Sequence, residues 1–192
     1  ETQLETDRRL LGQRIKSLKK RLGKVQSQRE QGRRSRQRGG VPVVSLVGYT
    51  NVGKSTLFNK MTSAKVYADD RLFATLDPTL RRVKLQETEL LIMADTVGFI
   101  RDLPHDLVES FSSTLEETRD AELLLHVVDC GANDRDGLIH HVNEVLKQIE
   151  ADEVRQVIIY NKIDKVDDIS PRIDRDDEGN INRIWLSART GE

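Results

Sequence analysis

Residues 48–55 fit the phosphate-loop pattern G-x-x-x-x-G-K-[ST], whose residue types and spacing suit a polyphosphate ligand. The glycines Gly48 and Gly53 let the backbone pass close to a phosphate without a Cβ clash. Successive N–H groups and the expected helix start offer positive partial charge to an anion. Lys54 would reach the β- and γ-phosphates, and the hydroxyl of Ser55 would bind Mg²⁺. For this segment alone, the alternative is a glycine-rich turn with a surface lysine.

A second segment, residues 95–98, fits D-x-x-G and follows the apolar run 90–94. A carboxylate at the end of a strand, here that of Asp95, suits a water-mediated hold on Mg²⁺. The N–H of Gly98 can meet a γ-phosphate. Standing alone, Asp95 would be read as a strand-ending aspartate in a turn.

Residues 161–164 fit N-K-x-D, a pattern that selects the base. The carboxylate of Asp164 can accept two hydrogen bonds, from N1–H and from the 2-amino group of guanine. Adenine offers no such pair of donors, so a buried aspartate would be left unpaired with ATP. Asn161 can bond the base and brace the phosphate loop, while the stem of Lys162 can cover the face of the ring.

The short element S-A-x at residues 187–189 follows the last expected strand, where the N–H of Ala188 can meet guanine O6. It is weak by itself and gains value from its position. Four motifs in this order, each at the end of an apolar run, point to GTP rather than to nucleotides in general. The residues predicted to bind GTP are Gly48, Tyr49, Thr50, Asn51, Val52, Gly53, Lys54, Ser55, Thr56, Phe73, Ala74, Thr75, Leu76, Asp77, Asp95, Thr96, Val97, Gly98, Asn161, Lys162, Ile163, Asp164, Ser187, Ala188 and Arg189.

A GTP-dependent switch needs a threonine that binds Mg²⁺ only when the γ-phosphate is present. The segment 71–79 offers Thr75 and Thr79, and we prefer Thr75 because Thr79 begins a strand. The residues predicted to be catalytic are Lys54, Thr75 and Gly98. The predicted Mg²⁺ ligands are Ser55, Thr75 and, through water, Asp95.

Two residues set this sequence apart from signalling GTPases. Phe99 follows D-T-V-G where many of those proteins carry a glutamine that orients water, and phenylalanine cannot do this. Hydrolysis must then depend on another residue, a cation or a partner, and the isolated domain should be slow. Asn51 could offer its side-chain oxygen to K⁺ near the phosphates, but we prefer the interpretation that this asparagine only shapes the loop.

The segments around these motifs alternate between strand and helix patterns. Strands are expected at 43–47, 80–85, 90–94, 123–129, 156–160 and 184–186, and helices at 54–61, 106–119 and 134–150. Residues 63–78 read as a long loop, and the short link at 86–89 predicts an antiparallel hairpin. Strand–helix alternation predicts an α/β fold with a mostly parallel, six-stranded sheet. His126 is expected to be a packed strand residue rather than a base.

The region before the phosphate loop has a different character. Residues 4–28 read as a helix with an a/d seam of apolar residues, and basic, glycine-rich residues 29–40 read as a linker. Residues 1–40 hold 13 Lys/Arg against 4 Asp/Glu, whereas residues 41–192 hold 18 against 28. A basic arm of residues 1–40 beside an acidic domain of residues 41–192 suggests RNA as a partner, with a solvated helix face as the alternative.

Whole-chain features restrict the setting. Cys130 is the only cysteine, so no intrachain disulfide can form and a reducing compartment is expected. No signal peptide is recognisable, and no apolar run reaches the roughly 18 residues needed to span a bilayer. We expect a cytoplasmic, monomeric protein with no DNA partner and at most peripheral contact with a membrane. Both ends look cut, and the helix that would close the domain after Arg189 is not in the sequence.

Taken together, these residues resemble the HflX family of ribosome-associated GTPases, with a P-loop, Ras-like G domain. The resemblance covers essentially the whole chain and rests on residues 1–9, 28–33, 48–55, 73–79 and 95–104. It implies GTP and GDP binding with Mg²⁺, and association with the large (50S) ribosomal subunit and its rRNA. It also implies splitting or rescue of ribosomes under stress, and residues 1–28 as the second arm of a helical hairpin. Some members are credited with ATP hydrolysis, which the argument for Asp164 does not predict.

Two other classes of function compete with a ribosome-coupled GTPase. One is a regulatory GTPase that acts on a membrane or on a protein target. The other is an RNA-binding module for which the nucleotide is only a structural ligand. Phosphate release, with and without ribosomal subunits, separates these classes.

Overall fold

The computed structural model describes residues 3–62, 79–85, 90–96, 98–99 and 112–192. The chain divides into two compact units, Glu1–Val41 and Pro42–Glu192. No helix among the described residues is long and apolar enough to cross a membrane.

The first unit is dominated by one helix, α1 (Gln3–Arg38). The expected linker at 29–40 is therefore wrong over most of its length, since the helix continues to Arg38. Arginine and glutamine are good helix formers, and Arg34 pairs with Glu30 one turn earlier at 2.5 Å. The apolar positions of the predicted seam are exposed in this unit: Leu11, Ile15, Leu18, Leu22 and Val25.

The second unit is built on one sheet in the order β2-β3-β1-β4-β5-β7-β6. Its strands are β1 (Val43–Val47), β2 (Thr79–Lys84), β3 (Leu90–Asp95), β4 (Leu123–Asp129), β5 (Gln156–Asn161), β6 (Arg172–Arg175) and β7 (Ile181–Trp185). The central strands run parallel, and β2 and β6 pair antiparallel at the two edges. The α/β, mostly parallel prediction is confirmed, but the described residues form seven strands rather than six.

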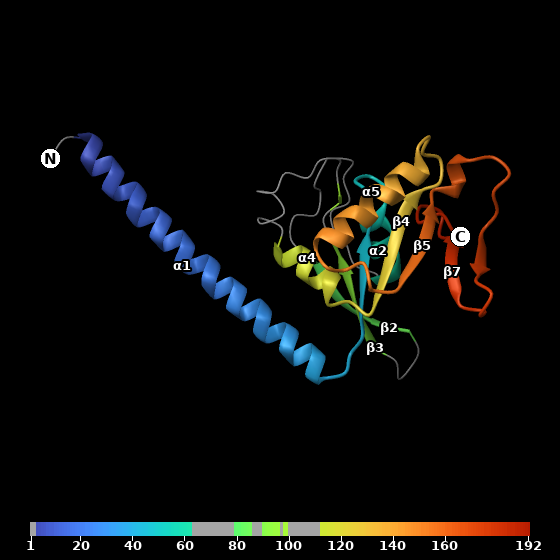
Figure 1. Ribbon diagram of the computed structural model, residues 1–192, viewed down its shortest axis with the longest axis horizontal. Helices are drawn as coiled ribbons and strands as arrows, with labels where there is room; N and C mark the ends of the chain where they lie inside the picture. The colour runs from blue at the N-terminus through green and yellow to red at the C-terminus, as the bar shows by residue number, and fades with distance from the viewer. Residues whose placement is uncertain (1–2, 63–78, 86–89, 97, 100–111) are drawn as a thin grey trace. The chain divides into compact units, whose positions relative to one another are not determined.

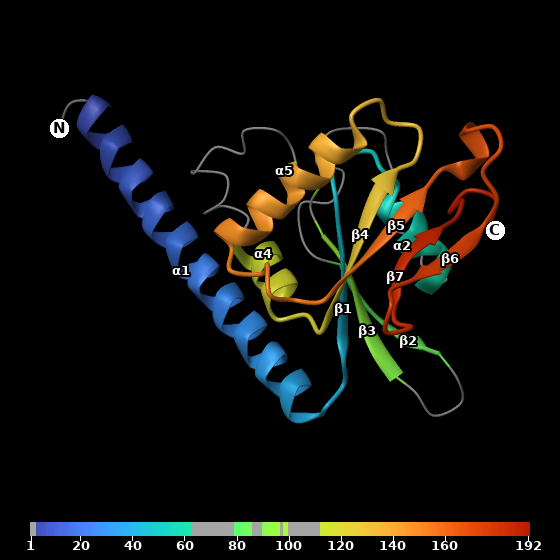
Figure 2. The same ribbon diagram turned by 45° about the vertical axis from the view of Figure 1, so that its right-hand side comes forward.

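Helices cover both faces of the sheet (Figures 1 and 2). Neighbouring residues of a strand point to opposite faces, so Leu46 and Val47 of β1 enter different cores. Leu46 packs with α2 (Lys54–Thr62), and Val47 packs with α4 (Ser112–Arg119) and α5 (Arg135–Gln148). Because β1, β3, β4 and β5 run parallel, their carboxyl ends lie at one edge of the sheet. The loops that follow these strands meet there.

The strand missed by the sequence analysis, β6, forms a hairpin with β7. Its sequence Arg-Ile-Asp-Arg is mostly charged and exposed, so it lacks the apolar alternation that marks a strand. Trp185 secures the hairpin: its ring stacks on Tyr160 at 4.1 Å between centroids, and Arg172 lies 4.1 Å from the ring centroid. The indole N–H donates to Asp174 at 2.8 Å, and this bond with the nearby Arg172 lowers the pKa of that carboxyl.

Candidate nucleotide-binding site

The loop between β1 and α2 has the backbone that its glycines predict. Gly48 and Gly53 have φ of 143° and 96°, and a Cβ at Gly48 would lie 2.2 Å from the carbonyl oxygen of Val127. Asn51 also takes a left-handed φ of 59°, a conformation that asparagine tolerates better than most residues. Only glycine fits at the first position without moving the backbone of β4.

Lys54, the first residue of α2, is 6% exposed. Its ammonium donates to the carbonyls of Gly48 at 3.2 Å and Tyr49 at 2.8 Å. An ammonium has three N–H donors, so the loop's own carbonyls fix its place while a donor remains for an anion. Burial lowers the pKa of Lys54 to about 8, against the raising effect of Asp95. The side chain is thus held beside the loop, where the negative charge of a bound phosphate would stabilise the protonated ammonium.

Ser55 and Asp95 lie together, because the Ser55 hydroxyl donates to the Asp95 carboxylate at 2.7 Å. Asp95 ends β3 and is fully buried. A hydroxyl and a carboxylate are hard oxygen donors, the type that Mg²⁺ prefers. The chemistry of this pair fits the predicted metal. Thr96 follows and anchors the segment by donating to the carbonyl of Leu46 at 2.5 Å.

Phe99 is joined to the phosphate loop by two backbone hydrogen bonds, and Gly98 lies close to the same loop. The N–H of Phe99 donates to Gly48 at 3.1 Å, and the N–H of Thr50 donates to Phe99 at 3.0 Å. A Cβ at Gly98 would lie 2.8 Å from Cγ2 of Thr50 and 2.9 Å from Nζ of Lys54. Phe99 is 1% exposed and packs in the core beneath α4 and α5, so its ring points away from the loop.

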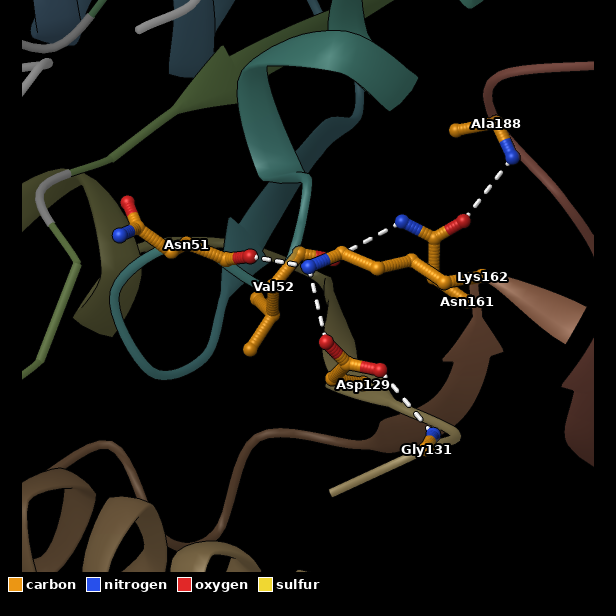
Figure 3. Close-up of polar contacts among 7 residues, drawn as sticks. All are labelled: Asn51, Val52, Asp129, Gly131, Asn161, Lys162 and Ala188. Atoms are coloured by element: carbon orange, nitrogen blue, oxygen red, sulfur yellow. Dashed lines mark hydrogen bonds and ion pairs between the residues drawn. The ribbon is translucent and has the colours of Figure 1, made fainter. Parts of the chain in front are cut away.

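Asn161 at the end of β5 connects two loops that are far apart in sequence (Figure 3). Its side-chain N–H donates to the carbonyl of Val52 at 2.8 Å, and its side-chain oxygen accepts from the N–H of Ala188 at 2.9 Å. The residue is 2% exposed. This geometry supplies the predicted brace to the phosphate loop and fixes the Ala188 segment beside it.

Lys162 reaches across the phosphate loop, and one of its partners, Asp129, was not identified in the sequence analysis. Its ammonium donates to the carbonyl of Asn51 at 2.6 Å and pairs with Asp129 at 2.8 Å (Figure 3). Asp129 ends β4 opposite Asn161 of β5, and it also accepts from the N–H of Gly131 at 3.0 Å. A polar residue at the end of a central strand, beside N-K-x-D, was the signal that could have identified it.

Asp164 lies in the short 3₁₀ turn Ile163–Lys165 and is exposed. The hydroxyl of Ser187 donates to its carboxylate at 2.6 Å, and Ser187 itself is 1% exposed. One carboxylate oxygen is thereby oriented by a buried partner. Arg189 is exposed and Ala188 is buried. The S-A-x element is held in place by the backbone N–H of Ala188, which donates to Asn161.

The remaining predicted site residues divide into two groups. Tyr49, Thr50, Ser55 and Thr56 are half-buried around the loop, and Val52 and Ile163 are buried. Several predicted residues lie outside the described ranges, and no position is given for them: Phe73, Ala74, Thr75, Leu76, Asp77 and Val97. Thr79, the alternative to Thr75, begins β2 and pairs with Asp95.

Two other reactive side chains near the site are packed. His126 of β4 is 1% exposed, and burial lowers its pKa to about 4, with Gln156 opposing and Lys54 reinforcing the effect. It is the buried strand residue that the sequence predicts. Cys130 is a free, buried cysteine, and burial raises the pKa of its thiol.

Known proteins resemble this chain in both sequence and fold. The profile of the family described as "50S ribosome-binding GTPase" matches residues 43–162. A "GTPase HflX" of Escherichia coli (strain K12) is 59% identical over 100% of this chain and 45% of its own length. The "GTPase HflX" of Caldanaerobacter subterraneus subsp. tengcongensis is 48% identical over 98% of this chain and 42% of its own length. The chain therefore spans less than half the length of each of these relatives.

Solved structures give the same fold. The crystal structure of SsGBP with GDP matches at a TM-score of 0.61 and 26% identity, over 85% of this chain and 47% of that one. The Aquifex aeolicus protein Era, bound to GDP and AlF₄⁻, matches at a TM-score of 0.59 and 19% identity, over 79% and 52%. At that identity the second match speaks for the fold alone.

Proposed function

The chain belongs to the 50S ribosome-binding GTPase family, in its HflX group, and on that premise we propose that it binds guanine nucleotides and hydrolyses GTP. One observation carries the proposal: Asn161, Lys162 and Asp164 are each bonded to another site segment, beside a glycine loop shaped for phosphates. SsGBP, which is similar in fold, was crystallised with GDP. The following roles are assigned on this basis.

At the base, the exposed carboxylate of Asp164 accepts from N1–H and the 2-amino group of guanine. Ser187 orients that carboxylate. The N–H of Ala188 donates to Asn161 in this structure, so it would have to share or exchange that partner to donate to O6. ATP would leave Asp164 without these donors. The carboxylate is exposed rather than buried as the sequence analysis expected, so water can solvate it and the penalty for ATP is smaller. We still expect GTP to be preferred and any ATP hydrolysis to be slower. At the phosphates, Lys54 and the loop N–H groups provide the positive charge.

Ser55 would hold Mg²⁺ directly, Asp95 through water, and Thr75 when the γ-phosphate is present. Mg²⁺ supplies neutralisation of charge on the phosphate oxygens. For Asn51, both proposed roles are kept. Its φ of 59° supports loop shaping, and its exposed position within the loop supports a K⁺ ligand. If exchange of K⁺ for Na⁺ leaves turnover unchanged, the K⁺ role is wrong.

Hydrolysis by the chain alone should be slow. The ring of Phe99 is buried in the core, so the position that often carries a water-orienting glutamine contributes no polar group. Gly98 can still donate its N–H toward the γ-phosphate. The missing polar group would come from a partner, and we propose that this partner is the large ribosomal subunit with its rRNA.

The basic arm, residues 1–40, and the G domain, residues 41–192, would divide the work. Helix α1 carries most of the arm's positive charge and is exposed, which supports RNA as its ligand. We propose a monomeric, cytoplasmic protein that splits or rescues ribosomes under stress and has no DNA partner.

The test is phosphate release from GTP and ATP by the chain, with and without large ribosomal subunits, in K⁺ buffer containing Mg²⁺. Strong stimulation by the subunit, with GTP preferred, is expected. GTP held without phosphate release, even with subunits, would favour an RNA-binding module. Turnover that only anionic vesicles or a protein target stimulate would favour a regulatory GTPase. Equal ATP turnover would refute the selectivity assigned to Asp164.

A further inference from the structure

Asp129 belongs to none of the four nucleotide motifs, yet it lies inside the site (Figure 3). It is the last residue of β4 and stands in register with Asn161 on β5. Its carboxylate is shared by two partners, the ammonium of Lys162 at 2.8 Å and the N–H of Gly131 at 3.0 Å. A strand-ending turn would need only the second of these bonds.

The ion pair is sheltered, because the two side chains are 23% and 27% exposed. A pair in such a place is screened less by water than a pair on an open surface. The Lys162 ammonium also donates to the carbonyl of Asn51 at 2.6 Å. Both residues joined by that bond have left-handed backbones, with φ of 67° and 59°. Lys162 is thus held at its backbone and at its ammonium.

A free lysine side chain has about 2 kcal/mol of rotamer entropy to lose. If that loss occurs when a ligand binds, it lowers the affinity, and a side chain held in advance avoids it. The stem of Lys162, between its two fixed ends, is the part that can cover the face of a purine ring. Its position therefore depends on whatever holds the ammonium.

We propose that Asp129 is a positioning residue for guanine recognition, acting through Lys162: its carboxylate fixes the Lys162 ammonium over the phosphate loop and so presents the lysine stem to the base. This inference rests on the proposed function. GDP and GTP should depend on Asp129 equally, since both carry the same base. A ligand with phosphates and no base should not depend on it.

The test is the dissociation constant of fluorescently labelled GDP for the 192-residue chain and for Asp129→Asn. Asparagine keeps an oxygen for the N–H of Gly131 and removes the charge that attracts Lys162. We expect affinity to fall about 10-fold, as for loss of one charge-assisted hydrogen bond. The inhibition constant of inorganic tripolyphosphate, measured by competition, should stay unchanged.

A double-mutant cycle shows whether Asp129 acts through the lysine. Lys162→Met keeps the apolar stem and removes the ammonium. In that background, Asp129→Asn should have no further effect on GDP binding. The matched control is Asp174→Asn, which removes a carboxylate paired with Arg172 on β6, and it should bind GDP like the unsubstituted chain.

The outcomes separate this inference from the proposed function. An unsubstituted chain that does not bind GDP refutes both. GDP binding that Asp129→Asn leaves intact refutes the inference alone. A loss of the same size with Lys162→Met present, or an equal loss of tripolyphosphate binding, would mean that Asp129 only supports the local fold, and it would also refute the inference.

Discussion

The two sides of the site are built in different ways. On the base side, side chains of Asn161, Lys162 and Ser187 tie four segments together through hydrogen bonds and one ion pair. On the phosphate side, the backbone takes part in several contacts, such as the N–H of Phe99 that donates to the carbonyl of Gly48, and the Ser55–Asp95 pair lies at the expected metal position. Lys54 is the cation of this side, and it bonds backbone carbonyls.

This difference separates two ways of recognising a ligand. A base has a particular edge, so the side that reads it needs side chains held at fixed positions. A chain of phosphates has charge and little shape, so backbone N–H groups and one cation are sufficient. We therefore expect substitutions on the base side to alter selectivity or local stability. On the phosphate side they should alter the binding or reaction of all triphosphates.

The largest effect should come from Lys54→Met, which would remove the cation of the phosphate side. The variant removes the buried ammonium and its bonds to Gly48 and Tyr49. GDP and GTP affinities should fall by more than about 100-fold, since a charge-assisted contact to phosphate is lost. Isothermal titration checks this. A fall of less than about threefold would mean that the loop N–H groups alone hold the phosphates.

Asn161→Ala should have the next largest effect and would break the base side. It leaves the buried carbonyl of Val52 and the N–H of Ala188 without their partner. Each unsatisfied buried group costs about 1–3 kcal/mol, so the free energy of unfolding should fall by about 2–6 kcal/mol. Urea denaturation measures this, with Asn133→Ala as an exposed control. Equal stability of both variants would show that water replaces the bonds.

Gly98→Ala should separate two functions of the phosphate side, GTP hydrolysis and GDP binding. The added Cβ would lie 2.8 Å from Thr50 and 2.9 Å from the Lys54 ammonium, so the segment must shift. GTP hydrolysis should fall about 10- to 100-fold, since a donor to the γ-phosphate is misplaced. GDP affinity should stay within about threefold, because no γ-phosphate is involved. A parallel loss of GDP affinity would contradict this assignment.

The smallest effect is a pH dependence confined to the phosphate side. Burial lowers the pKa of Lys54 to about 8, so its ammonium is lost above that pH and phosphate affinity falls. Between pH 7 and 8.5, GDP affinity should weaken about fourfold, and Lys54→Met should remove this dependence. The pH dependence of stability runs in the opposite direction to that of affinity. Between about pH 8 and 10.5 the unfolded chain binds more protons at Lys54 than the folded chain, so the free energy of unfolding rises with pH there.

The sequence predicted the parts of the site that side chains define. Asn161, Lys162, Asp164 and Ser187 lie together, because their motifs end neighbouring parallel strands or follow them. Asp129 was missed because a single aspartate forms no motif, and its role depends on the register between β4 and β5. Contacts that depend on distant backbone, such as the Phe99–Gly48 bond, have no local sequence pattern.

The fold was predicted where apolar periodicity was strong, and the two errors occur where it was weak. Strand β6 is short and charged, and it exists because Trp185 and the hairpin turn hold it against β7. Helix α1 continues through residues 29–38, where no apolar pattern supports a prediction. Straight-chain residues and an Arg34–Glu30 pair there favour the helix over the expected linker.

The stack of Trp185 on Tyr160 also gives the protein an optical probe of its own. Trp185 is the single tryptophan of the chain, two residues before Ser187, and its ring rests on the neighbour of Asn161. Its emission depends on the stacked ring, the Arg172 cation and the hydrogen bond to Asp174. We expect any adjustment of β5 or β7 that accompanies base binding to change that emission. Occupancy of the base side should then be measurable in real time by fluorescence of the unlabelled chain.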